Sequence, residues 1–366
     1  MASGDPNFPE HLRIAPSSRS TVRVAGAGGA ELDDGEDAAQ DIETFGIAGR
    51  TWEAAYLLRH YLSPPSALPS PPTFDPPCPL FSPPASHLPT PSPSRSPSPT
   101  PRQRRTILEL GSGTGFLSLA LAPHLQEGDT LVLTDLENVC PLLEKNLETA
   151  RGRWRARGVF PSPPAAADER SVGQGEPALL VRPLPWGDPA ALARLVAEGL
   201  QPDVILASDL IYFPFLYPLL LRTLIGLTQQ GGVKLLFSYK VRSLVKEQPF
   251  WEAFGRWFSL TPVQLGVPVP PSSPPSPAPS LTWTRFGAHT PSSTSSNPNE
   301  TDELYIFVCE RWPSTLPGSP QAGAAEDIEQ IGDEELMQGR GSAKGYEQGA
   351  GQFEEMLLLQ AGWDSD

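Results

Sequence analysis

Short apolar runs alternate with amphipathic stretches through most of the chain. The runs are rich in Leu, Val and Ile, which is typical of strands buried on both faces of a parallel sheet, and the stretches between them carry apolar residues at helical spacing. The predicted strands are 106–110, 130–134, 178–181, 203–207, 233–238 and 303–311. The predicted helices are 52–62, 116–125, 138–151, 189–200, 214–227 and 249–258. Strands that alternate with helices predict an α/β fold with a mostly parallel, doubly wound sheet.

Proline-rich stretches interrupt this pattern between the predicted elements. The chain has 45 prolines among its 366 residues, and they gather at 63–101, 159–177 and 267–299. These stretches have few apolar side chains and few backbone donors, so we expect disordered insertions. The remainder is about one α/β domain. We therefore expect a flexible region with one short strand over 1–40, a single domain over 41–312, and an acidic disordered tail over 313–366.

Charge and cysteine content narrow the class of protein. The net charge is −15, much of it in the tail, which disfavours a nucleic-acid partner. The three cysteines are scattered and form no CxxC pair, so neither a disulfide framework nor a zinc site is predicted. No apolar leader or run of membrane-spanning length occurs. We expect a monomer without a membrane partner in a reducing compartment, the cytoplasm or the nucleus.

A glycine-rich turn follows the first predicted strand of the sheet. Gly111, Gly113 and Gly115 are spaced GxGxG, and glycine permits the positive φ and close ligand approach that such a turn needs. A dinucleotide site usually has GxGxxG spacing. Glu109 stands just before the glycines, and an acid there suits a cationic ligand such as S-adenosylmethionine. A nicotinamide site and a purely structural turn remain open from the turn alone.

Two carboxylates follow later strands, at the edge of the sheet where parallel strands bind ligands. Asp135 comes twenty residues after the last glycine, where a carboxylate can accept the ribose hydroxyls of an adenosine; it could instead cap the helix that begins near Asn138. Asp209 follows a buried strand, where a carboxylate needs donors or a cation. Its alternative role is to cap the helix that begins at Pro214.

The chain also resembles a known family. In order, it contains ELGSGTG, LTDLENVCPLLEKNL, LPWGD and DVILASDLIYFPFLYPLLLRTL, and this set resembles the seven-strand S-adenosylmethionine-dependent methyltransferases, in particular the protein-lysine methyltransferases similar to methyltransferase-like 21. Their acidic residue, two others and an aromatic after the fourth strand match Asp209 to Tyr212. Their N-terminal Trp-x-Ala-Ala helix resembles the segment from Trp52 to Ala55. The resemblance covers 45–62, 104–260 and the last strand; the insertions and the tail are not typical of the family.

The resemblance implies a Rossmann-like seven-strand fold, S-adenosylmethionine as cofactor, and roles for nine residues. The methionine part of the cofactor would lie against Glu109, Gly111, Gly113 and Gly115, the ribose on Asp135, the adenine on Trp186, and Trp52 nearby. Asp209 would orient the amine of a substrate lysine, and Tyr212 would form part of the wall of the channel that the lysine enters. Trp186 could instead be a buried core residue, and Trp52 could only pack the end of the sheet. Arg242, after the fifth strand, could touch the substrate, but we expect it to be a solvated surface residue.

We therefore predict a protein-lysine N-methyltransferase, with a translation elongation factor or a chaperone as its substrate. The choice of lysine and of these substrates rests on the resemblance. A methyltransferase acting on small molecules or other residues is the main alternative. A nicotinamide-dependent oxidoreductase is disfavoured by the glycine spacing and Glu109, and a non-catalytic adaptor by the presence of Glu109, Asp135 and Asp209.

Overall fold

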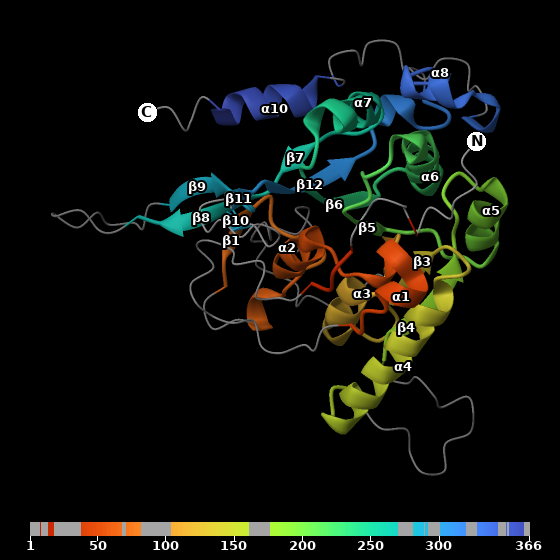
Figure 1. The fold of residues 1–366 in the computed structure, drawn as a ribbon, viewed down its shortest axis with the longest axis vertical. Helices are drawn as coiled ribbons and strands as arrows, with labels where there is room; N and C mark the ends of the chain where they lie inside the picture. The colour runs from red at the N-terminus through yellow and green to blue at the C-terminus, as the bar shows by residue number, and fades with distance from the viewer. Residues whose placement is uncertain are drawn as a thin grey trace, which may run out of the picture.

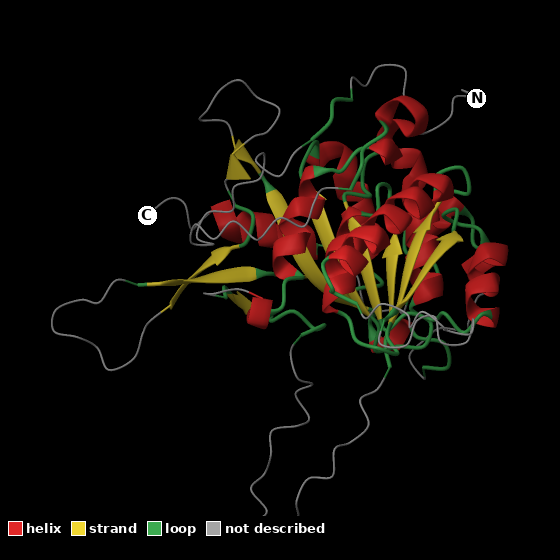
Figure 2. Cartoon of the chain, turned by 90° about the horizontal axis from the view of Figure 1, so that it is seen from below, coloured by secondary structure: helices red, strands yellow, loops and turns green. Residues whose placement is uncertain are grey.

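A twisted seven-stranded sheet forms the centre of the molecule (Figures 1 and 2). The computed structural model describes residues 8, 14–17, 38–67, 71–81, 104–160, 176–269, 281–288, 290–291, 301–319, 328–342, 349 and 351–361. The strands are β2 (Thr106–Leu110), β3 (Thr130–Asp135), β4 (Ala178–Pro183), β5 (Val204–Ser208), β6 (Lys234–Lys240), β7 (Thr261–Pro262) and β12 (Leu304–Glu310). Their order is β4-β3-β2-β5-β6-β12-β7.

The first five of these strands are parallel, and β12 pairs antiparallel with β6 and β7. The chain builds outward from β2 to β4 in one direction and then returns to β5 on the other side of β2. Ligands bind where the strand order reverses in this way, beyond the carboxyl ends of the strands. The predicted mostly parallel α/β fold is confirmed, and the site is expected between β2 and β5.

Helices cover both faces of the sheet. On one face lie α2 (Glu53–Tyr61), α3 (Phe116–Leu121) and α4 (Cys140–Ala156); on the other lie α5 (Pro189–Ala197), α6 (Tyr217–Leu227) and α7 (Leu244–Gly255). Ile107 belongs to the first apolar core and its neighbour Leu108 to the second, because side chains alternate along a strand. Both are fully buried, which explains why apolar residues occupy neighbouring positions in β2.

The remaining helices and strands lie outside the central sheet and the six helices that cover it. They are α1 (Ile42–Phe45), β1 (Thr73–Asp75), β8 (Gln264–Pro268), β9 (Leu281–Arg285), β10 (Thr290–Pro291), β11 (Thr301–Asp302), α8 (Asp333–Met337) and α10 (Gln352–Ala361). Single 3₁₀ turns occur at Gly46–Gly49, Pro65–Ala67, Ala122–His124, Pro214–Leu216, Pro313–Thr315 and Ile328–Gln330. The helix predicted to begin at Pro249 begins at Leu244 and carries that proline inside it.

Parts of the expected disordered insertions are folded, which corrects the prediction. β1 of the first insertion pairs with residues 264–266 of β8, just before the third insertion, and β8 pairs with β9 of the third insertion in a hairpin. The packing of Phe74 explains why β1 is folded: its ring centroid lies 4.9 Å from that of Phe286 and 5.2 Å from that of Tyr61. In the second insertion, Phe160 packs edge-on against Trp154 at 5.5 Å. A few apolar side chains thus anchor stretches whose composition is dominated by proline and serine.

The expected disordered tail also contributes to the core. Phe353 of α10 is buried and stacks on Trp251 of α7, with ring centroids 4.8 Å apart, and Figure 1 shows α10 beside α7. Leu336 of α8 is fully buried. The prediction of disorder rested on the acidic composition of the tail and did not take these few apolar residues into account. The strand expected near 20–24 lies outside the described residues.

Other structural features concern cysteines, membranes and metals. Cys78, Cys140 and Cys309 are buried and unpaired. No helix within the described ranges is long and apolar enough to cross a bilayer. Among the same residues, no group of three or more His, Cys, Asp or Glu side chains is placed to hold a metal ion.

Candidate active site

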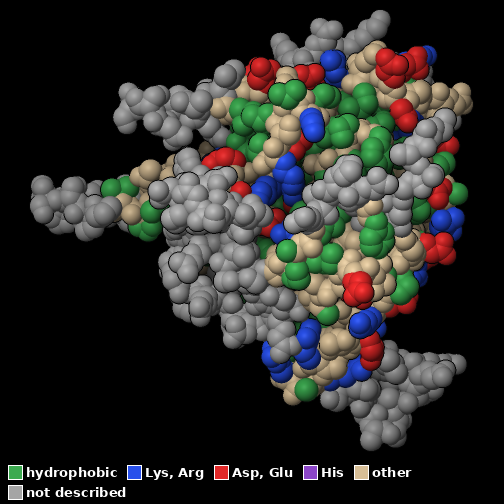
Figure 3. Space-filling view, viewed as in Figure 1, with side chains coloured by type: hydrophobic (Ala, Val, Ile, Leu, Met, Phe, Trp, Pro, Cys, Tyr) green, Lys and Arg blue, Asp and Glu red, His purple; other side chains and the backbone are tan. Residues whose placement is uncertain are grey.

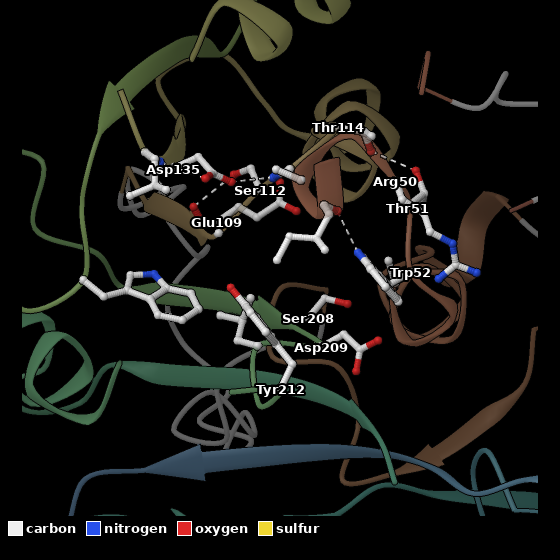
Figure 4. A pocket seen from close by; sticks show the side chains of 18 of the residues that line it. Arg50, Thr51, Trp52, Glu109, Ser112, Thr114, Asp135, Ser208, Asp209 and Tyr212 are labelled. Atoms are coloured by element: carbon white, nitrogen blue, oxygen red, sulfur yellow. Dashed lines mark hydrogen bonds between the residues drawn. The ribbon is translucent and has the colours of Figure 1, made fainter. Parts of the chain in front are cut away.

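A cavity of about 350 Å³ opens at the carboxyl ends of β2, β3 and β5, where the strand order reverses. Eight of the nine residues singled out in the sequence line it: Trp52, Glu109, Gly111, Gly113, Asp135, Trp186, Asp209 and Tyr212. In Figure 4 the labelled side chains from the glycine turn, the N-terminal segment and the loop after β5 surround one open space. Segments distant in the sequence therefore meet at this cavity.

The glycine turn is tied to the strands beneath it. The Ser112 hydroxyl donates to the carbonyl oxygen of Glu109 at 3.1 Å and accepts the amide of Thr134 at 3.0 Å. Gly113 has φ +54°, and a Cβ built there would lie 3.0 Å from the carbonyl oxygen of Ala48. Glycine is required at this position because the N-terminal segment crosses directly over the turn.

Gly115 has a different place from the other two glycines. It lies outside the cavity lining and immediately precedes α3, with φ +76°. A Cβ there would lie 3.1 Å from Leu143 and 3.2 Å from Leu133. Its contacts are therefore with the core, and the structure does not bring it to the cavity with Gly111 and Gly113.

Asp135 supports the glycine turn from the end of β3. One carboxylate oxygen accepts the amide of Gly113 and the other the amide of Leu136, each at 2.8 Å. Helix α4 begins at Cys140 and receives no side-chain cap, so the helix-capping alternative for Asp135 is wrong. Burial raises the pKa of this carboxyl to about 6, although the two amides act to lower it. A carboxylate offers about four lone-pair positions, so two acceptor positions remain.

Glu109 lies deeper, at the floor of the cavity. It is 3% exposed, and its carboxylate accepts the amide of Ser118 at 3.1 Å. Burial raises the pKa of Glu109 to about 7, while the bonds from Ser118 and Ser112 act to lower it. The carboxyl is consequently about half ionised at neutral pH, and a bound cation would favour the ionised form.

Aromatic side chains form one wall of the cavity. The ring of Trp186 lies 6.2 Å from Tyr212, Tyr212 lies 4.9 Å from Phe213, and Phe213 stacks on Phe215 at 5.5 Å. Trp186 is half-buried: it lines the cavity and also packs against the second apolar core, so it is not a fully buried core residue. Phe215 is 64% exposed, and the aromatic wall therefore runs from the cavity to the surface. Burial raises the pKa of Tyr212, which keeps its hydroxyl protonated.

Asp209 is held by an arginine that the sequence did not connect to it. Its φ is +60°, the one positive value among the described non-glycine residues, and its side chain is fully buried. Arg242 donates to its two oxygens at 2.7 and 2.5 Å. The helix after β5 has no side-chain cap, so the capping alternative is wrong. Arg242 is exposed, as expected, but it also lines the cavity, where it pairs with Asp209.

Comparison with known proteins places the chain in a family. A family model described as lysine methyltransferase matches residues 33–157 and 171–256, more than half of the chain. The chain belongs to the lysine methyltransferase family. Protein-lysine N-methyltransferase EFM6 of Saccharomyces cerevisiae (strain ATCC 204508 / S288c) is 28% identical over 145 residues, which are 37% of this chain and 50% of that protein. The chain thus spans about half the length of this curated relative.

Two solved structures align more loosely with this member of the lysine methyltransferase family. SMU.776 complexed with SAH is 14% identical, with a TM-score of 0.32 over 56% of this chain and 45% of that chain. Precorrin-6y C5,15-methyltransferase from Geobacter metallireducens GS-15 is 10% identical, with a TM-score of 0.27 over 58% of this chain and 83% of that chain. Both TM-scores are too low to bear on the fold or the ligand.

The segment before α2 closes the remaining side of the cavity in this family member. The Trp52 indole donates to the carbonyl oxygen of Ile47 at 3.0 Å. The Arg50 guanidinium lies 4.3 Å from the Trp52 ring centroid, and that of Arg242 lies 5.4 Å away. The Trp52 ring therefore lies close to two cations as well as lining the cavity. On the face of the molecule that Figure 3 shows, Lys and Arg side chains gather around a hollow near the middle, and hydrophobic side chains border it.

Sequence reasoning missed four residues that shape the cavity, Arg50, Thr51, Ser112 and Thr114, and it missed the pairing of Arg242 with Asp209. Thr51 and Thr114 join the N-terminal segment to the glycine turn by a hydroxyl–hydroxyl bond of 2.8 Å. A signal for Ser112 and Thr114 was their position between the glycines. Nothing local marks Thr51 or Arg242, because their partners lie 63 and 33 residues away in the sequence.

Proposed function

We propose that this protein is an S-adenosylmethionine-dependent protein-lysine N-methyltransferase. The observation that carries the proposal is the convergence of the glycine turn, Glu109, Asp135 and Asp209 on one cavity at the reversal of strand order. Membership of the lysine methyltransferase family supports the choice of reaction and of acceptor. The name of the yeast relative, a protein-lysine N-methyltransferase, agrees with a protein substrate.

The residues around the cavity fit this donor. Asp135 retains two acceptor positions for vicinal hydroxyls beyond its bonds to Gly113 and Leu136. The buried Glu109 carboxyl, with its raised pKa, would be stabilised by a cation nearby. The flat indole of Trp186 offers a face for a planar base. When bound, S-adenosylmethionine would supply a methyl group carried on a sulfonium sulfur.

The aromatic wall suits a lysine acceptor. A lysine accepts a methyl group as the neutral amine, whereas its ordinary pKa is about 10.4. Lining by Trp186, Tyr212 and Phe213 reduces the water around the side chain, and desolvation disfavours the charged ammonium. The same ring faces can hold the methylated, cationic product by cation–π contact. We propose that Tyr212 forms this wall and that Asp209 orients the amine.

The substrate is proposed to be a protein. Translation elongation factors and chaperones, the classes implied by the family resemblance, are the first to test. The cytoplasm is the compartment in which we propose to look for them.

The test is methyl transfer from isotopically labelled donor to extract proteins, followed by mass spectrometry of lysine-containing peptides. We expect label in protein bands and on lysine. Label confined to small molecules would favour the small-molecule alternative, and calorimetric binding of NAD but not of S-adenosylhomocysteine would favour an oxidoreductase. Asp135→Ala should lose both donor binding and transfer. Glu137→Ala, which removes an exposed carboxylate outside the cavity lining, is the matched control and should keep both.

A further inference from the structure

We propose that Arg242 is a positioning residue of the methyl-transfer site. Its guanidinium holds the Asp209 carboxylate in one orientation and cancels its charge, so that an incoming lysine meets a neutral pair and not an unpaired carboxylate. This inference rests on the proposed function and adds to it the residue that fixes the orientation of the Asp209 carboxylate and neutralises its charge.

The pair is held from both sides. Two parallel bonds join the guanidinium to the carboxylate, a geometry that fixes the direction of the carboxylate as well as its distance. The amide of Asp209 donates to the carbonyl oxygen of Ser238 at 2.8 Å, which supports the left-handed backbone of Asp209. Asp209 is fully buried, whereas 30% of the Arg242 side chain remains exposed. The arginine therefore stands between the carboxylate and solvent.

The other charged groups near Arg242 have partners of their own. Glu247 accepts the backbone amide of Arg242 at 3.3 Å and also the hydroxyl of Tyr239. Arg50 pairs with Glu53 at 2.5 Å, and the Lys240 ammonium pairs with Asp302 at 2.6 Å. Burial acts to lower the pKa of Arg242, but Asp209, Glu53 and Glu247 outweigh it and hold that pKa above its ordinary value. Arg242 is thus a permanent cation beside Asp209.

The titratable and charged groups at the cavity and around Arg242 come from six parts of the chain. They are Arg50 and Glu53 before and in α2, Glu109 and Asp135 at the ends of β2 and β3, Asp209 and Tyr212 after β5, Lys240 and Arg242 at and after β6, and Glu247 in α7. Without Arg242, the carboxylate of Asp209 would attract the ammonium form of lysine. That form binds well but cannot accept a methyl group. The Arg242 charge therefore favours deprotonation of the bound amine.

The test measures kcat and KM against pH for the full-length protein with its protein substrate. In Arg242→Gln, we expect the rising limb of the kcat profile to move about one pH unit higher, with a lower KM. Arg242→Lys keeps the charge and loses the bidentate geometry, so its limb should stay in place while kcat falls. In the double variant Asp209→Asn/Arg242→Gln, no unpaired carboxylate remains. Its limb should return to the wild-type position, although kcat stays low.

A purely structural role gives a different outcome. It would lower kcat in all three variants at every pH and leave the position of the limb unchanged, which would overturn the proposal. Wild-type kcat and KM in Arg242→Gln would also overturn it. Lys246→Gln, which removes an exposed positive charge from the start of α7, is the matched control for net charge and should leave the profile unchanged.

Denaturation tests the pair without any need for activity. We expect the Asp209→Asn and Arg242→Gln single variants to be coupled, with their joint effect on the unfolding equilibrium constant at least tenfold smaller than the product of the single effects. If the wild type methylates no protein lysine, the proposed function fails whatever the coupling. If it methylates lysine but the coupling is absent, the pair proposed here fails alone.

Discussion

Glu109→Gln tests the electrostatic reasoning about the cavity most directly. The ordinary pKa of 4.5 for this carboxyl is raised to about 7 by burial in the folded protein. A pKa shift of one unit corresponds to about 1.4 kcal/mol. Ionised Glu109 therefore costs the folded state about 3 kcal/mol once the pH exceeds 7. Glutamine has nearly the same shape and carries no charge. Its carbonyl oxygen can still accept the amide of Ser118.

The sign of the pH dependence follows from proton linkage. Because the pKa of Glu109 is higher in the folded than in the unfolded state, the folded protein binds more protons between pH 4.5 and about 7. The stability that this carboxyl contributes is complete below pH 4.5 and is lost as the pH rises through about 7. Glu109→Gln should therefore gain about 3 kcal/mol relative to wild type between pH 4.5 and pH 8, as measured by urea denaturation at each pH.

The affinity for the donor should depend on pH in the opposite direction to the stability, rising as the pH rises. A cationic donor favours ionised Glu109, so its affinity for the wild type should fall about tenfold between pH 8 and pH 6. Calorimetry should find this component absent in Glu109→Gln, where the titrations of Asp135, whose pKa is about 6, and of the donor's own amine remain. Parallel stability curves for the two proteins, or an identical pH dependence of binding, would refute the reasoning about Glu109.

Three further substitutions test the glycine turn, its support and the tail. Gly113→Ala should lower Tm and weaken binding of S-adenosylhomocysteine at least tenfold, since the added Cβ meets the backbone of Ala48. The control is Gly199→Ala, where φ is also positive (+71°) but the space around an added Cβ is open. It should lower Tm and leave binding unchanged. Asp135→Asn removes one of two acceptors for backbone amides and should cost about 1–3 kcal/mol by denaturation, with donor binding weakened; unchanged values would contradict its supporting role. Phe353→Ala should cost about 3 kcal/mol with donor binding intact, whereas the exposed Glu354→Ala should not, and equal Tm values would place the tail outside the core.

The order of elements along the chain was predictable because it depends on local patterns. Neighbouring apolar residues in β2 and β5 identify strands buried on both faces, and helical spacing identifies α4 and α6. Composition was a poorer guide. A single aromatic residue such as Phe74 or Phe353 can order a segment rich in proline or acid if a core surface is available to receive it.

The site was predictable to the extent that parallel strands end at one edge of the sheet. Glu109 lies near the end of β2, Asp135 ends β3 and Asp209 follows β5, and topology alone brings them to one cavity. Their hydrogen-bond partners were not predictable. Asp135 was open between a ribose ligand and a helix cap, and the structure shows a third contact, with the amide of Gly113.

The sequence by itself determined the α/β alternation, the strand ends that carry carboxylates and the glycines of the turn, because each depends on residues near one another in the chain. Only the tertiary structure decided that Gly115 faces the core, that the N-terminal segment crosses the turn, and that Arg242 neutralises Asp209. Those contacts join residues far apart in sequence. Their energies depend on burial and direction, which exist only once the chain has folded.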